Sequence, residues 1–283
     1  MHSGSCIGTQ GPASHPHLGV LMKVTFWGTR ASYPFFTPAH TRLGGDTSCV
    51  GLEVPSSRLF IDAGTGLMHA EPTTGHDVIL LSHFHLDHVL GLPYFLGKKR
   101  QGALTLASAN CSSEADLVAR INSVYGGVGF PVSLSLISPS MQFLPLGAGA
   151  CQIGPWTISS CELNHPGRSF GYRVGVEGSD AQVVYLSDHE HGTDADARMV
   201  RFSEGASLVV WDSSYDDEHF SPFKGWGHST WQEGIRFFKA CGAQQLALSH
   251  HDPARTDEVA AAIEAQLSPG VILAHDRLSL SLA

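Results

Sequence analysis

The chain has 283 residues, of which 42% are hydrophobic, and its formal net charge is −9. This length provides one large domain or two small ones, with ample apolar material for a core. The acidic balance, with only 17 Lys and Arg, argues against the basic face that binders of long nucleic acid usually carry. No stretch reaches the roughly 18 apolar residues that a membrane span needs.

The first residues, 1–21, are rich in Ser, Gly, Pro and His and lack the basic-then-apolar pattern of a signal peptide. We expect a disordered extension there, followed by one domain over residues 22–283. No Cys-x-x-Cys pair occurs, so the cysteines are interpreted as reduced thiols of a cytoplasmic protein. They are Cys6, Cys49, Cys111, Cys151, Cys161 and Cys241.

The first half of the chain is predicted to alternate strands with loops and helices. Apolar runs bounded by turn residues predict strands at 24–28, 48–54, 58–62, 78–82 and 103–107. Helical spacing follows at 87–97 and at 112–125, the second helix being capped by Ser112 or Ser113. The segment 30–47 is too long for a simple connection, so we expect it to be functional. The segment 126–131 is expected to be flexible.

The second half is predicted to continue in the same style. Strands are expected at 156–163, 170–176, 182–186, 207–212, 246–249 and 271–274. Helices are expected at 193–203, at 229–241 with Ser229 or Thr230 as cap, and at 256–267. Strands followed by strand–helix alternation, repeated twice, indicate an α/β fold of two packed sheets with helices outside.

Four potential metal ligands follow the strand at 78–82: His83, His85, Asp87 and His88. Strand alternation carries the first two imidazoles to the same side, where both can bind one cation. The other two side chains lie on the following turn and can face a second cation. A lone His is more often structural, but clustered buried His and Asp are costly without a partner. Two such cations a few ångströms apart form a hydrolytic device.

The motif His-x-His-x-Asp-His after an apolar strand resembles the signature of the metallo-β-lactamase fold hydrolases. Further landmarks of that superfamily are similar in this chain and arrive in the expected order, each at a strand end. They are His165 in Leu-Asn-His-Pro, Asp188 after the strand at 182–186, and His250 after the strand at 246–249. The resemblance extends from about residue 23 to residue 275. It implies a four-layer αββα sandwich of two mixed sheets with outer helices.

The resemblance also implies a ligand set for two divalent ions per chain. The first metal would take His83, His85 and His165. The second would take Asp87, His88 and His250, and Asp188 would bridge the two. Zinc is the expected metal, and manganese or iron suits the same ligands. A hydroxide shared by the two ions would be the nucleophile.

The element Gly227-His228-Ser229-Thr230 before a helix resembles the phosphodiesterase branch of the superfamily. That branch includes ribonuclease Z and the phosphoribosyl cyclic phosphate phosphodiesterases. By this resemblance His228 would contact the phosphate and help to protonate the leaving oxygen. The expected catalytic residues are His228 and, from the metal-binding motif, Asp87. The alternative is that His228 only caps the helix N-terminus.

Further side chains are candidates for supporting roles. Asp62 and Asp212 could orient ligand histidines from behind. Asp46 could approach the substrate or only shape a turn. Three other histidines could line the pocket or lie on the surface: His189, His191 and His251.

One departure from ribonuclease Z narrows the substrate. Many of those enzymes carry an arm that grips tRNA between the third metal His and the bridging Asp, whereas here His165 and Asp188 are 23 positions apart. A small phosphodiester, cyclic or linear, therefore fits better than tRNA. The alternatives are a thioester or lactone hydrolase on the same metals and a metal-bearing accessory protein without turnover. A homodimer is the default assembly, because closed two-fold assemblies are the commonest.

Overall fold

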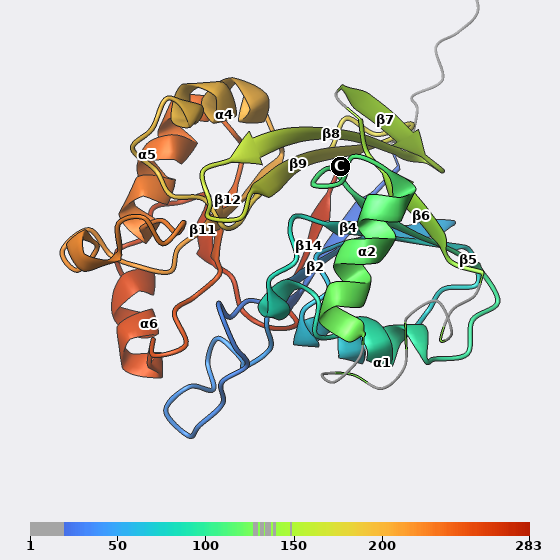
Figure 1. The fold of residues 1–283 in the computed structure, drawn as a ribbon. Helices are drawn as coiled ribbons and strands as arrows, with labels where there is room; N and C mark the ends of the chain where they lie inside the picture. The colour runs from blue at the N-terminus through green and yellow to red at the C-terminus, as the bar shows by residue number, and fades with distance from the viewer. Residues whose placement is uncertain (1–19, 127–129, 131–132, 134–136, 138–139, 148) are drawn as a thin grey trace, which may run out of the picture.

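The computed structural model of the chain describes residues 20–126, 130, 133, 137, 140–147 and 149–283. Two seven-stranded sheets pack face to face, and helices cover both outer faces (Figure 1). This arrangement confirms the predicted αββα sandwich. Most of the expected extension at 1–21 and of the segment 126–131 lies outside the described residues.

The first sheet has the strand order β14-β1-β2-β3-β4-β5-β6. Its pairs are antiparallel from β14 to β3 and parallel from β3 to β6. The strands are β1 Met22–Gly28, β2 Cys49–Val54, β3 Ser57–Ile61, β4 His76–Leu81, β5 Ala103–Ser108, β6 Gln142–Pro145 and β14 Ser279–Leu282.

The second sheet has the order β13-β12-β11-β10-β9-β8-β7 and the same mixed character. It is parallel from β13 to β10 and antiparallel from β10 to β7. The strands are β7 Ala150–Ile153, β8 Trp156–Leu163, β9 Ser169–Val176, β10 Gln182–Leu186, β11 Leu208–Asp212, β12 Leu246–Ser249 and β13 Val271–Leu273.

The core lies between the sheets, and strand alternation explains why β4 is apolar throughout. Val78 and Leu80 face the second sheet, where they join a cluster with Tyr172 and Val210. Ile79 and Leu81 face the opposite way and pack beneath the helices. A strand that is buried on both faces has no solvent side on which to place a polar residue.

The helices pack on the two outer faces. On the first sheet lie α1 Leu92–Leu96 and α2 Glu114–Tyr125, and on the second lie α4 Ala195–Ser203, α5 Trp231–Cys241 and α6 Asp257–Glu264. Short 3₁₀ turns are η1 Thr65–His69, η2 Leu86–His88 and η3 Ser221–Phe223. The capping hydroxyls are those of Ser113, Thr230 and Thr256, each accepting a backbone N–H three residues on.

The single helix predicted at 87–97 is wrong. The chain forms η2, breaks, and begins α1 only at Leu92. The backbone is diverted here because Ala63 N–H donates to the His88 carbonyl and Gly91 N–H donates to the Ala63 carbonyl. Pro93 also opens α1, a position that suits its missing N–H. Three edge or near-edge strands, β6, β7 and β14, were not predicted.

Two general features bear on the sequence expectations. The five cysteines in the described part of the chain are free thiols. Among the described residues, no helix combines the length and apolarity that crossing a membrane requires.

Candidate metal centre

The predicted ligands meet at one edge of the sandwich. His250 follows β12 directly, and His83 and Asp188 each follow their strands, β4 and β10, by two positions. The carboxyl ends of the parallel strands in an open α/β sheet gather at one edge, which is where ligands bind. The connection between β8 and β9 adds His165 from the antiparallel part of the second sheet.

The first group of ligands is His83, His85, His165 and Asp188, whose ligand atoms all lie within 4.8 Å of one another. Nε2 of His83 lies 3.2 Å from Oδ2 of Asp188, and Nε2 of His165 lies 3.7 Å from the same oxygen. Nε2 of His165 also lies 3.2 Å from Nδ1 of His85. His85 is exposed, whereas the other three side chains are buried, so this group opens to solvent on one side.

The second group is Asp87, His88 and His250. Oδ2 of Asp87 lies 3.3 Å from Nε2 of His88 and 3.4 Å from Nε2 of His250. Asp188 contacts this group as well, with Oδ1 2.9 Å from His250 Nε2 and Oδ2 3.2 Å from His88 Nε2. Asp188 thus touches histidines of both groups, as a bridging carboxylate must.

The donor atoms of these groups fit divalent cations. Nε2 of His83, of His88 and of His250 is buried, and none of the three has a hydrogen-bond partner among the described residues. Buried polar atoms without partners are rare because each costs the free energy of lost hydration. Here three of them converge on the oxygens of Asp188. A cation coordinated by imidazole and carboxylate would satisfy all of them at once.

The electrostatics of the centre favour positive charge. Burial, and secondarily the charge of His88, lowers the pKa of His83 to about 4. Burial also acts to lower the pKa of His88 and of His250, but Asp188 and the other carboxylates outweigh it and hold both pKa values well above the ordinary range. The carboxylates thus stabilise positive charge at these two buried imidazoles. A divalent cation would supply such charge, and its binding would compete with protons for the same ring nitrogens.

Three residues of the centre have left-handed backbone. The φ angles are +61° at Asp62, +60° at Asp188 and +57° at His250. Residues other than glycine rarely adopt this conformation, and where they do so it often marks a functional site. Each of these residues follows the end of a strand, so the turn directs its side chain or backbone towards the centre.

Asp62 supports the second group from behind. Its Oδ2 lies 2.7 Å from Nδ1 of His88 and accepts the hydroxyl of Tyr185 at 2.9 Å. Its Oδ1 accepts the backbone N–H of Ser82 at 2.8 Å and the Ser82 hydroxyl at 2.9 Å. The carboxylate sets the tautomer of His88, because a proton on Nδ1 leaves Nε2 free to bind metal.

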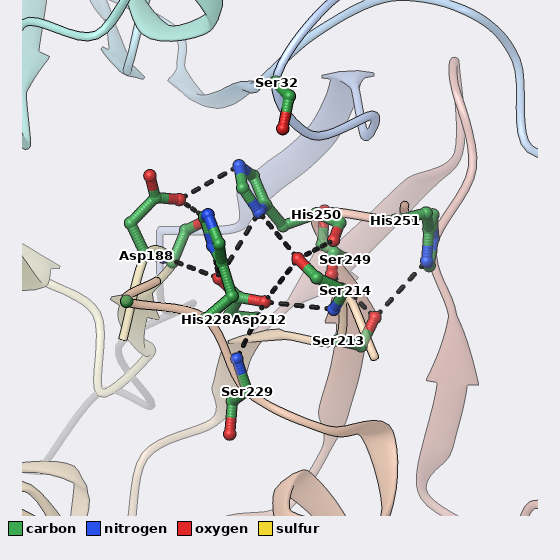
Figure 2. A network of polar contacts seen from close by, with 12 residues as sticks. Ser32, Asp188, Asp212, Ser213, Ser214, His228, Ser229, Ser249, His250 and His251 are labelled. Carbon is green, nitrogen blue, oxygen red and sulfur yellow. Dashed lines mark hydrogen bonds and ion pairs between the residues drawn. The ribbon is translucent and has the colours of Figure 1, made fainter. Parts of the chain in front are cut away.

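Asp212 supports His250 and the proposed proton donor together (Figure 2). Its Oδ2 lies 2.9 Å from Nδ1 of His228 and 3.3 Å from Nδ1 of His250, and it accepts the backbone N–H of Asp188 at 3.1 Å. Burial acts to lower the pKa of His228, but Asp212 raises it above the ordinary value. Because Nδ1 is held by Asp212, Nε2 is the ring nitrogen that can contact another group.

Gly227 allows the loop before α5 to approach His165. Nδ1 of His165 donates to the Gly227 carbonyl at 3.0 Å, which leaves Nε2 for a metal. Gly227 has a φ of +88°, and a Cβ there would lie 2.0 Å from Nδ1 of His165. No other residue type fits this close approach.

The remaining candidates lie around the ligand groups, not among them. His189 accepts the Asn164 N–H at Nδ1 (3.2 Å) and contacts Asp196 through Nε2 (3.1 Å). Nδ1 of His191 lies 2.7 Å from the hydroxyl of Ser229.

Two further candidates hold neighbouring loops. His251 accepts from Arg255 Nη1 at 2.9 Å and donates from Nε2 to the Ala274 carbonyl at 2.7 Å. Asp46 accepts the Thr65 hydroxyl at 3.0 Å through Oδ1, and its Oδ2 lies 3.0 Å from Nε2 of His69. The contacts of Asp46 favour the alternative that it shapes a turn. The alternative that His189 and His251 lie on the surface is wrong, because both side chains are fully buried.

Sequence reasoning missed several supporting groups. The backbone N–H of Ser32, on the long loop after β1, donates to Oδ2 of Asp87 at 2.8 Å, so this loop does reach the centre. The hydroxyl of Ser214 donates to Asp212 at 2.8 Å, and Glu190 contacts the loop of Gly227. A serine or glutamate gives no periodic signal, and no spacing rule marks these positions.

Comparisons with known proteins identify the family of the chain. The family model described as "Beta-lactamase superfamily domain" matches residues 57–251. The protein named ribonuclease Z from Bradyrhizobium sp. (strain ORS 278) is 24% identical over an alignment of 307 positions, which covers 90% of this chain and 98% of the relative.

Solved structures share the fold. The metallo-β-lactamase fold protein YhfI from Bacillus subtilis superposes with a TM-score of 0.69 at 19% identity, covering 93% of this chain and 99% of YhfI. A diphosphatase from the PhnP family superposes with a TM-score of 0.66 at 18% identity, covering 93% and 97% of the two chains.

Proposed function

The chain belongs to the β-lactamase superfamily, and from this premise we propose that it is a binuclear metal-dependent phosphodiesterase for a small cyclic or linear phosphodiester. The observation that carries the proposal is the place of His228 beside both ligand groups. Its ring centroid lies 5.4 Å from that of His165 and 5.1 Å from that of His250. A substrate held between the two groups would present its leaving oxygen to this imidazole.

The metal ligands proposed are those of the sequence prediction. His83, His85 and His165 would hold one ion, Asp87, His88 and His250 the other, and Asp188 both. Two divalent cations, zinc in the first instance, would supply Lewis acidity and lower the pKa of a bound water. Manganese and iron remain the alternatives, because imidazole and carboxylate suit all three.

The chain's own residues would direct the proton. Asp212 holds Nδ1 of His228 and so fixes the plane of the ring, with Nε2 towards the leaving oxygen. Protonation of that oxygen lets it depart as an alcohol. The Ser32 N–H fixes Oδ2 of Asp87, the other predicted catalytic residue, against the second group.

The short connection between His165 and Asp188 supports a small substrate. It is occupied by β9 and β10, which belong to the body of the second sheet. The relative from Bradyrhizobium is named ribonuclease Z, so RNA is the competing substrate class. The net charge of −9 favours the small diester, because an extended polyanion needs a basic surface.

The first test is hydrolysis of bis(p-nitrophenyl) phosphate by the purified full chain, with metal content determined on the same sample. We expect turnover and about two metals per chain. A strong chelator should remove the metals and abolish turnover, and added zinc or manganese should restore turnover. A short 3′-extended RNA and a thioester serve as competing substrates. Two metals with hydrolysis of the thioester alone would contradict a phosphodiesterase.

The second test is His228→Ala. We expect normal metal content and a loss of turnover of about 10²-fold or more for a diester with an alkyl leaving group, as for loss of a general acid. Turnover of bis(p-nitrophenyl) phosphate by the variant should fall less, because p-nitrophenolate leaves without a proton.

The metal content of His228→Ala also tests a competing arrangement. Asp188, Asp212, His228 and His250 form a third group with the spacing of a metal site. Loss of one metal in this variant would make His228 a ligand and overturn its role as proton donor. His219→Ala is the matched control, since that imidazole is exposed and paired with Asp216.

Other expectations stay predictions. A cytoplasmic location is supported by the five free cysteines. We also propose that the chain forms a homodimer and that residues 22–283 are a single domain.

A further inference from the structure

Three loops of the centre meet at Glu190. One carries Asp188 and His189 after β10, one carries Asn164 and His165 after β8, and one runs through Gly225 and Gly227 into α5. The backbone of Glu190 binds the second loop: its N–H donates to the Asn164 carbonyl at 2.9 Å, and its carbonyl accepts from Asn164 Nδ2 at 2.8 Å.

The side chain of Glu190 binds the third loop. Its carboxylate accepts the Gly225 N–H, at 2.9 Å to Oε1 and 2.7 Å to Oε2, and the Gly227 N–H at 2.9 Å to Oε2. Hydrogen bonds to an ionised acceptor are about twice as strong as neutral ones. Gly225 and Gly227 have φ angles of +87° and +88°, a conformation that glycine adopts freely and that needs an external contact to hold it.

The peptide units held in this way touch both functional parts of the centre. The carbonyl of Gly227 accepts from Nδ1 of His165, and the next residue is His228. Gly227 therefore connects the Glu190 carboxylate to both parts of the centre. Its carbonyl contacts His165 of the first metal group, and its peptide bond leads to His228, the proposed proton donor. Among the described residues, the Glu190 side chain makes no hydrogen bond or ion pair with a proposed ligand, so it acts through the loop.

We propose that Glu190 is a positioning residue that fixes His165 and His228 together by hydrogen-bonding the loop Gly225–Gly227. The part concerning His228 rests on the proposed function, and the part concerning His165 rests only on metal binding. An exposed acidic residue of no consequence is the simple alternative. That alternative does not explain why two backbone N–H groups make three contacts with one half-buried carboxylate.

The test uses three substitutions of Glu190 in the full metal-loaded chain. Glu190→Ala removes both acceptors. Glu190→Asp keeps the charge but is one methylene too short to reach both glycines. Glu190→Gln loses the charge, yet its carbonyl oxygen in the place of Oε2 can still accept from both. Glu258→Ala, an exposed glutamate in the first turn of α6, is the matched control.

Two quantities are measured for each variant. The first is zinc affinity by competition with a chromophoric chelator, which we expect to fall by about 10-fold or more in Glu190→Ala, in the range seen when partners of ligand histidines are lost. The second is kcat for a diester with an alkyl leaving group, expected to fall by about 10²-fold for a misplacement of about 1 Å. KM and the kcat for bis(p-nitrophenyl) phosphate should change much less.

The order of the variants decides between causes. We expect Glu190→Gln to retain most of the affinity and kcat, Glu190→Asp to lose about as much as Glu190→Ala, and Glu258→Ala to match the unsubstituted chain. Activity in Glu190→Asp but not in Glu190→Gln would overturn the proposal in favour of a charge effect. Unchanged affinity and kcat in Glu190→Ala would overturn it outright. If the unsubstituted chain lacks diesterase activity, the proposed function fails, and the zinc affinities still test Glu190.

Discussion

Asp188→Ala is expected to remove both metals and to lower phosphodiester turnover by more than about 10³-fold, since bound cations supply several kcal/mol of charge stabilisation. The physical reason is that this carboxylate is shared. Its oxygens lie 2.9 Å from His250, and 3.2 Å from both His83 and His88. Without it the two groups lose their common negative charge, and the imidazoles that remain repel cations once they are protonated. Metal content by elemental analysis and turnover on the same sample measure the effect.

Asp188→Asn separates the loss of charge from a folding defect. Asn tolerates the left-handed backbone at this position better than Ala and retains the side-chain shape. We expect it to fold and still to lose at least one metal. Asp194→Ala is the control, because Asp194 is an exposed residue preceding α4 that makes no side-chain cap contact. Two tightly bound metals in Asp188→Asn or Asp188→Ala would mean that Asp188 does not bridge.

Asp62→Ala should cost the metal-free protein about 3–5 kcal/mol of its free energy of unfolding, as expected when one partner of a buried ionic network is removed. The carboxylate is fully buried and receives hydrogen bonds from Ser82, Tyr185 and His88. Its removal leaves all of these donors without an acceptor, in the layer between the two sheets. Urea denaturation of the metal-free chain measures the loss.

Asp62→Asn makes the same position a test of metal binding. Its Oδ1 can still accept from Ser82, so most of the stability should remain. Its amide would donate to Nδ1 of His88 and force the proton onto Nε2, the atom needed for metal, so zinc affinity should fall about 10- to 100-fold. The exposed Asp180→Ala is the control. Equal stability of Asp62→Ala and the unsubstituted chain would show that water replaces the carboxylate.

The predicted fold was accurate where the pattern was local and strong. The apolar run through Val78 and Leu81 predicted a buried strand, and the structure has β4 there. The helix predicted at 229–241 with Ser229 or Thr230 as cap is present as Trp231–Cys241, and Thr230 is the cap. The prediction failed where distant backbone decided. Helical spacing continued past Asp87, but the backbone of Ala63, in the segment that follows β3, took the hydrogen bonds that a helix needs.

The unpredicted strands have a different cause. β6 and β7 are four residues each, ordered by pairing with β5 and β8 at the ends of the two sheets. β14 alternates Ser and Leu over four residues and is paired with β1 at the opposite end of the chain. Short strands carry little intrinsic preference, because their stability comes from the neighbour they pair with.

The candidate ligands were accessible from sequence because each follows a strand end. His83, Asp188 and His250 need only the strand to end and the next residues to turn, and parallel strands bring such ends together. The residue types then limit the chemistry to metal binding. The order of strands and helices in the sequence therefore determined the two packed sheets with outer helices. The family resemblance, together with the residue types at the strand ends, indicated a metal-binding centre.

The sequence offered Asp62 and Asp212 as candidates for orienting ligand histidines, but only the tertiary structure decided which ring each contacts and which other groups take part. Asp62 meets Tyr185 across the two sheets, Ser32 reaches Asp87 from a long loop, and Glu190 holds the backbone of Gly227. These hydrogen bonds depend on loop conformation to within a fraction of an ångström, and hydrogen-bond strength falls steeply with distance and angle. Residue spacing does not reveal these hydrogen bonds, because they form only when the packed sheets bring separate segments of the chain together.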